Sequence, residues 1–582
     1  MASGPKRKAG RANHPSGDRP ARPAYRAALA AGAAAAAVYA GTAGHAFVYD
    51  DIEGILNNPL VRGFGSLAQA GSFLRETWRP LTQLSYALTH YFFGFEAWAY
   101  HLGNVLIHAA NSALVCLIAD LAGRLWLSAD KRRHFAPAAG LIFALHPLQS
   151  EAVAYVWGRS SSLCAMFYFG SLLLVMFGSR AESVRRRLAC YGGALLAGIL
   201  AWASKEEAIT LPLLAAGYFL LVGCRKAAAV AALIPVLVVA ARWGAIGRLY
   251  AEVGENRFLV SAGAEPALPP WTYFLTHVRE FVFYYLRRYV WPSGLNADPA
   301  TRPAGGITDP AFLAAALVFV ALAAWALWAL RRERAVTFAL AALLISPLTA
   351  YGLMPLADVV AEHRAYISTL GFAMVAAWAL ARRPRRTAAL LPAVALVLGA
   401  VTWQRSRAWR DGLTLWSDTA RKSPGLARPH LNLGMALQSA GRADEALAEY
   451  RRALEINAGL APAYVNMSAI YFDRGDIAAC RAALERAAAL SPRLAAPYIN
   501  LGILSLRQGR PAEALEFLDR ALAIEESHIV RFNRGEAFFQ LGRSAEAARE
   551  YERALELRPD LEEMKEQIRL RLEQLRKAGA VR

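Results

Sequence analysis

The chain has 582 residues, too many for one ordinary soluble domain, and 56% of them are hydrophobic. Its formal net charge of +20 would suit a protein that binds nucleic acid. The basic residues, however, gather in an N-terminal tail and in short loops between long apolar segments. That arrangement argues against a nucleic-acid-binding protein and favours a membrane protein.

Eleven apolar segments follow a basic tail over residues 1–26. Several contain about 20 residues without a charge, enough to cross a hydrocarbon core of roughly 30 Å. The eleven candidate spans are residues 27–43, 104–123, 136–146, 161–179, 188–203, 207–223, 227–243, 309–330, 335–354, 365–381 and 387–403. They predict an all-α, polytopic membrane domain over residues 27–403. A cleaved signal peptide is the alternative interpretation of the first segment.

Short arginine-rich loops separate alternate spans. These loops are residues 124–133, 180–187, 225–226, 331–334 and 382–386. The positive-inside rule places such loops, and with them the N-terminus, in the cytoplasm. An odd number of spans then puts the C-terminal region on the outer side of the membrane.

Segment 271–292 is an exception, because it mixes aromatic residues with several charged ones. If it crossed the membrane, two of the arginine-rich loops would move to the outside and break the positive-inside rule. We therefore predict that it forms an interfacial or re-entrant helix on the outer side.

Four similar segments follow the last span, between residues 427 and 561. Three repeat with a period of 34 residues, and the fourth starts 33 residues after the third. Their eighth positions hold small residues, which let two antiparallel helices approach closely. This pattern is typical of tetratricopeptide repeats and predicts an α-solenoid. Residues 404–426 are expected to form a connecting helix or partial repeat, and residues 562–582 a capping helix.

The repeats also share an asparagine at their sixth position. The four residues are Asn432, Asn466, Asn500 and Asn533. One side-chain amide per repeat forms a ladder that can hydrogen-bond the main chain of an extended peptide without reading its sequence. The ladder is therefore a candidate peptide-binding surface. The alternative is that asparagine serves only the repeat scaffold.

Six stretches, in a fixed order, resemble a known family. They are "FVYDDIEGILNNP", "WRPLTQLSYALTHYFFG", "YHLGNVLIHAANSALV", "LIFALHPLQSEAVAYVWGRSSSLCAMFYF", "SKEEAITLPLL" and "AEHRAYISTLGF". The ordered set resembles the transmembrane and tetratricopeptide-repeat O-mannosyltransferases and their bacterial relatives, which have the GT-C glycosyltransferase fold. The last stretch departs from the family, where Glu-Arg-Tyr-Leu-Tyr is usual; here Glu362 is followed by His363, Arg364, Ala365 and Tyr366.

The resemblance implies an inverting glycosyltransferase in a bacterial inner membrane. Such an enzyme takes a sugar, mannose by the family name, from a polyprenyl-phosphate carrier. It transfers the sugar to Ser or Thr of exported proteins at the outer membrane-water boundary, and the repeats bind the acceptor on the periplasmic side. The expected partners are the lipid-linked sugar, acceptor proteins and membrane lipids; no cofactor and no nucleic acid are expected.

Asp50 and Asp51 are the candidate catalytic residues. A hydroxyl is a poor nucleophile near neutral pH, and a carboxylate can take its proton as it attacks. Adjacent acids raise one another's pKa, which suits a base, although a solvated loop is the alternative. The leaving lipid phosphate needs cationic donors, unless the cations pair with neighbouring acids or contact lipid headgroups. The candidate donors are Arg364, His363, Lys205 and Arg159.

Further polar residues fall in the same outer loops. These site candidates are Arg79, His146, Glu151, Glu206 and Glu362. Arg79 is expected to contact one of the two substrates, and Glu362 is the next candidate for the base. His146 and Glu151 are of types that bind metals, but the set is sparse and a sugar phosphate leaving group needs no metal, so none is predicted.

Two other functions fit parts of the sequence. One is a ligase that transfers a lipid-linked oligosaccharide, since some such enzymes also carry repeats. The other is a non-catalytic assembly factor whose repeats recruit partners, in which case the outer carboxylates would tolerate substitution. The paired acids in the first outer loop favour a monosaccharide transferase over the ligase.

Overall fold

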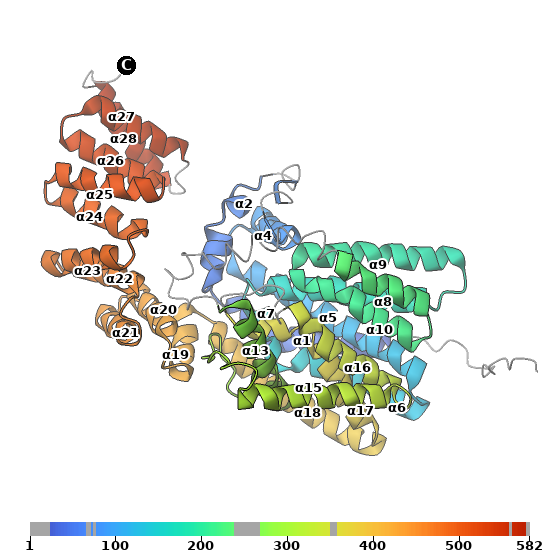
Figure 1. Ribbon diagram of the computed structural model, residues 1–582. Helices are drawn as coiled ribbons and strands as arrows, with labels where there is room; N and C mark the ends of the chain where they lie inside the picture. Colours follow the sequence, from blue (N-terminus) through green and yellow to red (C-terminus); the bar gives the residue numbers. More distant parts are fainter. Residues whose placement is uncertain are drawn as a thin grey trace, which may run out of the picture.

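The protein is all-helical in the part that the structure describes. The computed structural model describes residues 24–65, 71–73, 77–237, 268–349, 358–557 and 562–577, and no strand occurs among them. Figure 1 shows two parts, a bundle of apolar helices ending with α18 (Pro384–Ser406) and an array of shorter helices from α19 (Gly412–Lys422) onward. The predicted all-α class, with membrane-type helices followed by repeats, is confirmed.

Six helices of the described residues are long and apolar enough to cross a membrane. They are α1 (Tyr25–Tyr39, continued by a 3-10 turn, η1, Ala40–Gly44), α5 (Ala97–Trp126), α8 (Arg159–Gly178), α9 (Val184–Ser204), α15 (Pro310–Ala329) and α18. Apolar side chains on the outer helices are exposed, for example Leu317 at 70% and Leu396 at 75%. Helices that are apolar on their exposed faces as well are typical of contact with lipid.

Shorter helices occupy the other predicted spans. They are α6 (Ala129–Leu145), α10 (Leu211–Leu221), a helix over residues 225–237, α16 (Arg334–Ile345) and α17 (Thr369–Ala381). Within the described residues each is shorter than the roughly 20 residues that a span requires, so the count of eleven spans remains a prediction. The ends of predicted spans 227–243 and 335–354, and residues 1–23 of the basic tail, lie outside the described residues.

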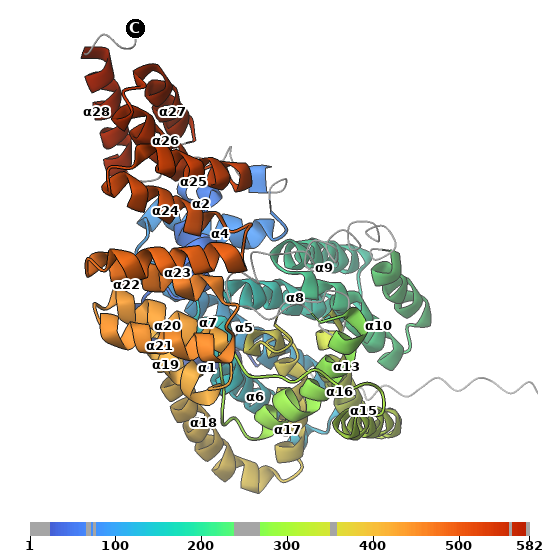
Figure 2. The same ribbon diagram turned by 60° about the vertical axis from the view of Figure 1, so that its left-hand side comes forward.

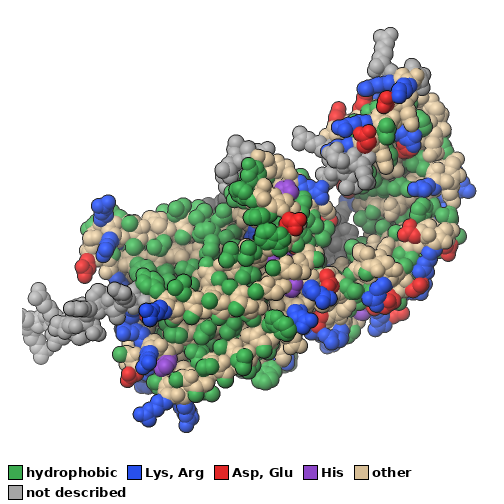
Figure 3. Space-filling model, turned by 180° about the vertical axis from the view of Figure 1, so that it is seen from behind, with side chains coloured by type: hydrophobic (Ala, Val, Ile, Leu, Met, Phe, Trp, Pro, Cys, Tyr) green, Lys and Arg blue, Asp and Glu red, His purple; other side chains and the backbone are tan. Residues whose placement is uncertain are grey.

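The arginine-rich loops and the repeats lie at opposite ends of the bundle. Figure 3 shows Lys and Arg side chains gathered at the end away from the repeats, while apolar side chains cover much of the flank. The connection between α5 and α6 is only two residues long, so the two helices run antiparallel. The α5–α6 loop is therefore at the basic end, and His146, after α6, is at the repeat end.

The predicted interfacial segment 271–292 forms one continuous helix. It comprises α13 (Pro270–Glu280), a π-helical stretch η6 (Phe281–Leu286) and α14 (Arg287–Val290). Tyr285 donates a hydrogen bond to Ala361 O at 2.8 Å, and Tyr289 donates to Ala365 O at 3.0 Å. The helix therefore supports the loop before α17, at the repeat end of the bundle (Figure 1). Its placement at a membrane interface remains a prediction.

The array consists of four antiparallel helix pairs and a final helix. The pairs are α20 (Ala427–Ser439) with α21 (Ala443–Ile456), α22 (Ala461–Asp473) with α23 (Ile477–Leu490), α24 (Ala495–Arg507) with α25 (Pro511–Ile524), and α26 (His528–Gln540) with α27 (Ser544–Glu556); α28 (Glu562–Lys577) follows. Figure 2 shows the pairs stacked one on another from α19 to α28. The turn inside each pair holds a glycine with positive φ, such as Gly441 at +75°, a conformation that other residues adopt at a cost.

Packing and hydrogen bonds join the start of the array to the bundle. A 3-10 turn, η9 (Arg407–Trp409), leads from α18 into α19, which packs on α20 as the second helix of a partial repeat would. Ser423 Oγ donates to Asp298 O at 2.7 Å, and Lys422 Nζ donates to Leu295 O at 2.6 Å. The start of the array is therefore docked on the loop that follows α14.

Gly371 is required where α17 crosses α16. An ideal Cβ at this position would lie 2.3 Å from Leu343 N and 2.4 Å from Ala339 O, both backbone atoms of α16. We therefore expect Gly371→Val to force the helices apart and to lower the free energy of unfolding by about 1–3 kcal/mol. Thermal unfolding of the purified protein in detergent checks this.

Gly170 on α8 is the matched control, because a Cβ there would meet nothing within 4 Å. Gly170→Ala should leave the unfolding midpoint unchanged or raise it, since alanine favours a helix by about 0.5–1 kcal/mol over glycine. Equal midpoints for the two variants would contradict the close crossing.

Candidate functional site

Polar loops at the repeat end of the bundle carry the predicted site residues. They are residues 45–58 after η1, residues 77–79 before α4 (Pro80–Phe93), residues 146–158 around α7 (Ser150–Ala154), residues 205–210 with the 3-10 turn η5 (Glu206–Thr210), and residues 358–368 with the turn η8 (Glu362–Ala365). Each loop joins helices of the bundle, so segments far apart in the sequence meet at this end.

Asp51 is a buried anchor. Its Oδ2 accepts a hydrogen bond from Val48 N at 2.9 Å, and its Oδ1 accepts from Trp157 N at 2.7 Å. The side chain has no solvent exposure, and this burial raises the pKa of Asp51 to about 8 despite the two backbone donors. Asp51 therefore ties the first outer loop to the loop after α7 and has no oxygen left for a substrate.

Asp50 lies beside Asp51 but is only half-buried. Tyr155 donates a hydrogen bond to Asp50 Oδ2 at 2.8 Å, and no donor within the described ranges reaches Oδ1. Burial raises the pKa of Asp50 to about 6, with a further contribution from the charge of Asp358, while the Tyr155 hydrogen bond and Arg428 act in the opposite direction. Asp50 thus keeps one free carboxylate oxygen and a pKa near neutral, as a general base requires.

The backbone separates the two carboxylates. Tyr49 has φ +54°, a left-handed conformation that is uncommon for a tyrosine. Its ring contacts Tyr155 and lies edge-on to Trp416 of α19, with ring centroids 5.0 Å apart. Tyr155 itself stacks on Trp409 at 4.9 Å. Aromatic packing therefore holds the strained turn that aims Asp51 inward and leaves Asp50 at the surface.

Glu151 and His363 form an acid–imidazole pair. Glu151 Oε1 lies 2.6 Å from His363 Nδ1, and Glu151 Oε2 accepts from Glu362 N at 2.8 Å. Burial raises the pKa of Glu151 to about 7. Burial, with the charges of Lys205 and Arg364, lowers the pKa of His363 well below its usual value. A neutral imidazole that donates through Nδ1 keeps Nε2 free, and the side chain is 24% exposed.

Arg364 presents one unused edge of its guanidinium. Its NH1 donates to Asp358 O at 2.7 Å, to Val359 O at 3.2 Å and to Tyr273 OH at 3.3 Å. Within the described residues, neither Nε nor NH2 has an acceptor. These three contacts fix the plane of the guanidinium, while Nε and NH2 can bind two oxygens of a phosphate together.

Lys205 and Arg79 are paired with carboxylates instead. Lys205 Nζ lies 2.7 Å from Glu207 Oε1 and donates to Ser161 Oγ at 2.8 Å. Arg79 donates to both oxygens of Glu206, at 3.1 and 2.7 Å. Burial alone would raise the pKa of Glu206, but the Arg79 and Lys205 charges lower it to about 2. Both cations contribute to the potential around His363, although each already has an acid as partner.

Arg159 is placed differently from the expectation that it binds a donor phosphate. It is buried, and it donates from Nε to Asn104 Oδ1 at 2.7 Å and from NH2 to Tyr100 O at 2.8 Å. Its NH1 reaches Ser85 and Thr89, and the guanidinium lies over the Tyr86 ring at 4.7 Å. These contacts use its donors inside the protein, so Arg159 fixes helix packing around the site.

His146 and Glu362 are also enclosed by protein. His146 Nε2 lies 3.0 Å from Tyr289 O, and its Nδ1 accepts from Leu148 N. Glu362 Oε1 accepts from Tyr284 OH at 2.8 Å and from Asn296 N at 2.6 Å. Such engaged side chains position loops, and Glu362 lacks the free oxygen that a base needs.

The structure also adds residues that the sequence did not single out. Arg428, on the first helix of the first repeat, donates to both oxygens of Asp298 at 2.7 and 2.5 Å. Its NH2 also donates to Asp358 Oδ1 at 2.7 Å. The negative charge of Asp358 raises the pKa of Asp50, and the backbone carbonyl of Asp358 accepts a hydrogen bond from Arg364. Asp358 lies three residues before the stretch "AEHRAYISTLGF", whereas no local pattern points to Arg428.

The asparagine ladder is exposed and largely unused. All four residues, Asn432, Asn466, Asn500 and Asn533, are partly exposed. Only Asn533 forms a hydrogen bond within the described residues, to Ile529 O at 2.8 Å. The first three amides therefore remain available to bind a main chain.

The described residues contain no group of three or more His, Cys, Asp or Glu side chains placed to hold a metal ion. The expectation of a site without metal or cofactor remains a prediction.

Comparisons identify the region of residues 427–561 as repeats. Three models of the tetratricopeptide repeat match residues 427–459, 459–527 and 529–561. These matches coincide with the four helix pairs.

Comparisons also relate the chain to proteins named protein O-mannosyl-transferases. It is 35% identical over 196 residues to Tmtc2 of Drosophila melanogaster, covering 31% of this chain and 20% of that protein. It is 33% identical over 196 residues to TMTC2 of Homo sapiens, covering 31% and 22%. It is 26% identical over 444 residues to F38B6.6 of Caenorhabditis elegans, covering 72% and 61%. The chain thus spans about a fifth of the length of the first two relatives and less than two thirds of the third.

The two adjacent aspartates should differ in their effect on stability. Asp51→Asn leaves one buried N–H, of Val48 or Trp157, without an acceptor, which costs about 1–3 kcal/mol. Asp50→Asn keeps an oxygen for Tyr155 and should unfold like the wild type. Thermal unfolding of both purified variants checks this, and equal midpoints would remove the structural role assigned to Asp51.

Proposed function

This chain is a relative of the transmembrane and tetratricopeptide-repeat O-mannosyltransferases, and we propose that it glycosylates proteins. It transfers one sugar, mannose, from a polyprenyl-phosphate carrier to Ser or Thr of exported proteins. One observation carries the proposal: the same set of loops holds a candidate base and a candidate phosphate ligand. Asp50 is a half-buried carboxylate with a free oxygen, and Arg364 has a guanidinium with a free edge. Asp358 links the two, since it faces Asp50 and holds Arg364.

The reaction is a single displacement at the anomeric carbon. The acceptor hydroxyl oxygen forms a bond to that carbon as the carbon–oxygen bond to the lipid phosphate breaks. Asp50 Oδ1 takes the hydroxyl proton, and the electron pair of the broken bond stays on the phosphate. Attack from the face opposite the phosphate inverts the configuration of the sugar.

Arg364 and His363 receive the leaving phosphate. The Nε and NH2 groups of Arg364 offer two parallel donors, which match two phosphate oxygens. His363 is held by Glu151 through Nδ1, so it donates to the phosphate only as the imidazolium, in which Nε2 also carries a proton. Lys205 and Arg79 add positive potential without leaving their carboxylate partners. Cations that are fixed before the substrate binds stabilise charge that develops on the leaving group.

The repeats bind the acceptor polypeptide. Figure 3 shows a hollow between the curved array and the membrane bundle. The free amides of Asn432, Asn466 and Asn500 offer donors and acceptors for an extended main chain. An acceptor held along the array would lead toward the first repeat, whose Arg428 already lies in the site.

The orientation follows from the basic loops. Arginine-rich loops face the cytoplasm in membrane proteins, so the opposite end, with Asp50 and the repeats, faces the periplasm of a bacterial inner membrane. The lipid-linked sugar and exported acceptors meet on that side.

Asp50→Asn should abolish transfer while the protein still accumulates in the membrane. Removing a positioned base reduces the rate by about 100- to 10,000-fold. The measurement is transfer of radiolabelled mannose from polyprenyl-phosphate-mannose to a protein acceptor. Glu53→Gln is the control, because Glu53 is an exposed carboxylate in the same loop whose one hydrogen bond is to Asn57. If Asp50→Asn transfers normally, Asp50 is not the base and this mechanism is wrong. If the wild type itself transfers no sugar, the assembly-factor function is favoured.

Arg428→Ala should shift the pH profile of transfer toward higher pH. The base works only when ionised, so activity should rise through the pKa of Asp50, about 6. Tyr155, Asp358, Glu151 and Arg428 face Asp50. Without Arg428, the unpaired negative charge of Asp358 raises the pKa of Asp50 further. The rate should therefore fall more at pH 6 than at pH 8.

Arg428→Ala combined with Asp358→Asn is the matched control for this shift. The double variant removes the excess negative charge, so its profile should return toward that of the wild type. A uniform loss of rate at every pH, with no recovery in the double variant, would mean that Arg428 only holds the loops together.

Asn466→Ala with Asn500→Ala should raise the KM for protein acceptors and leave transfer to a short peptide unchanged. The short peptide reaches the site without the ladder, so only long acceptors lose main-chain contacts. Arg486→Ala, at an exposed position on α23, is the control. Unchanged KM values across several protein acceptors would leave the ladder with a scaffold role.

A further inference from the structure

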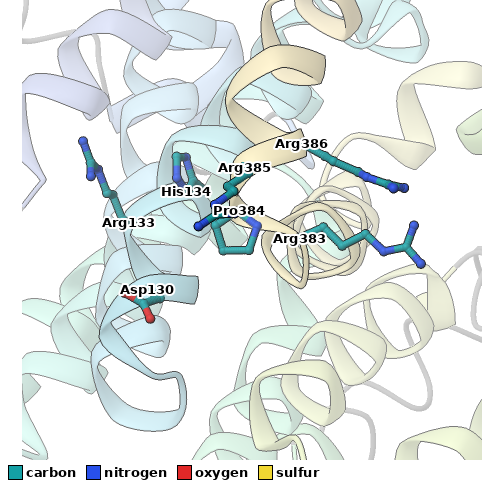
Figure 4. Close-up of a pocket in the computed structure, with 7 residues that line it drawn as sticks. All are labelled: Asp130, Arg133, His134, Arg383, Pro384, Arg385 and Arg386. Carbon is teal, nitrogen blue, oxygen red and sulfur yellow. The ribbon is translucent and has the colours of Figure 1, made fainter.

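A basic pocket lies at the end of the bundle opposite the site. It has a volume of about 580 Å³ and is lined by Asp130, Arg133, His134, Arg383, Pro384, Arg385 and Arg386. Figure 4 shows His134, Pro384 and Arg385 between α6 and the start of α18, while the side chains of Arg133, Arg383 and Arg386 extend outward from the two helices. His134, the pocket residue nearest the site along α6, is twelve positions before His146, and a helical segment of that length spans roughly 18 Å. The pocket is therefore distinct from the site around Asp50.

The arginines of this pocket have no acidic partners. Four exposed arginines and a single carboxylate line the pocket, and none of the four arginines forms an ion pair within the described part of the chain. Two basic residues at the same end are paired: Arg124 with Asp120 at 2.8 Å, and Lys131 with Glu333 at 3.3 Å. Unpaired like charges around one cavity repel each other, so an anion inside it would relieve that repulsion.

The first turns of two helices add to the positive potential. Asp130 lies in the first turn of α6, and Arg385 and Arg386 lie in the first turn of α18. Helix N-termini carry partial positive charge and free N–H groups, and cations there are unfavourable unless an anion binds. The positive potential is therefore more favourable with an anion bound in the pocket than without one.

An apolar stripe on α18 leads away from the pocket. Arg386, Leu390 and Val397 follow one another at spacings of four and seven residues, so they share one face of the helix. Leu390 is 48% exposed and Val397 is 61% exposed. A ligand with a charged group in the pocket and an acyl chain along this face would satisfy both surfaces.

We propose that this pocket binds the phosphate headgroup of an anionic lipid of the cytoplasmic leaflet. The positive-inside rule explains why arginines are on this side, but it requires neither that they line one cavity nor that they lack partners. Arg185, Arg186 and Arg187, in the first turn of α9, are exposed on the same side like the four pocket arginines, but they do not line this pocket. Basic pockets between membrane helices are a known way to hold lipid phosphates.

The test measures lipid binding to the full-length protein, independently of transfer activity. The purified chain in detergent is titrated with phosphatidylglycerol or phosphatidylcholine, and bound lipid is counted by native mass spectrometry. We expect one phosphatidylglycerol to be retained, and we expect Arg133→Gln with Arg385→Gln and Arg386→Gln to weaken it at least tenfold. The control, Arg185→Gln with Arg186→Gln and Arg187→Gln, removes the same charge and should bind like the wild type.

Three outcomes would overturn the proposal. Equal loss in the two triple variants would mean that general surface charge attracts the lipid. Equal retention of both lipids would mean that the headgroup charge is not recognised. Displacement of phosphatidylglycerol by millimolar inorganic phosphate would identify a site for free phosphate rather than a lipid. Arg385→Lys is a second variant that keeps the charge and should retain binding, which guards against loss by misfolding.

Discussion

The buried carboxylate of Glu362 holds the outer loops together. Its side chain accepts from Tyr284 of the helix over residues 270–290 and from the backbone of Asn296, and it lies 3.4 Å from Arg405 at the end of α18. Its own N–H donates to Glu151. A charge without solvent contact is unfavourable unless such partners surround it, and removing one partner typically costs about 3–5 kcal/mol. The placement of His363 and Arg364, the next two residues, depends on this cluster.

The two aspartates of the first outer loop show how burial assigns roles to identical side chains. They differ by one position in the chain, yet one carboxylate is saturated by backbone N–H groups and the other has a free oxygen. The left-handed Tyr49 turns the backbone just before the two aspartates and is held by Tyr155 and Trp416. Aromatic packing from the bundle and from α19 thus determines which acid can reach a substrate.

The sequence allowed the helices, the repeats and the side of the bundle that carries the polar loops to be predicted. Those features depend on local patterns, such as apolar runs, arginine-rich loops and a period of 34 residues. The use of each polar side chain could not be predicted, because it depends on contacts between distant segments. Arg159 donates its hydrogen bonds to Asn104 and Tyr100 of the neighbouring helix, and nothing in the motif around it indicates these contacts. Arg428 reaches Asp298 across 130 residues of chain.

The contact between Arg428 and the membrane domain has a consequence for modular engineering. The natural boundary suggested by the repeat pattern is residue 427, but α20 carries a guanidinium that belongs to the loops around Asp50. A chimera that exchanges repeat arrays to redirect acceptor choice must therefore retain the first helix pair with the bundle. The interchangeable unit begins at α22, after Leu460, and everything before it behaves as one body with the membrane helices.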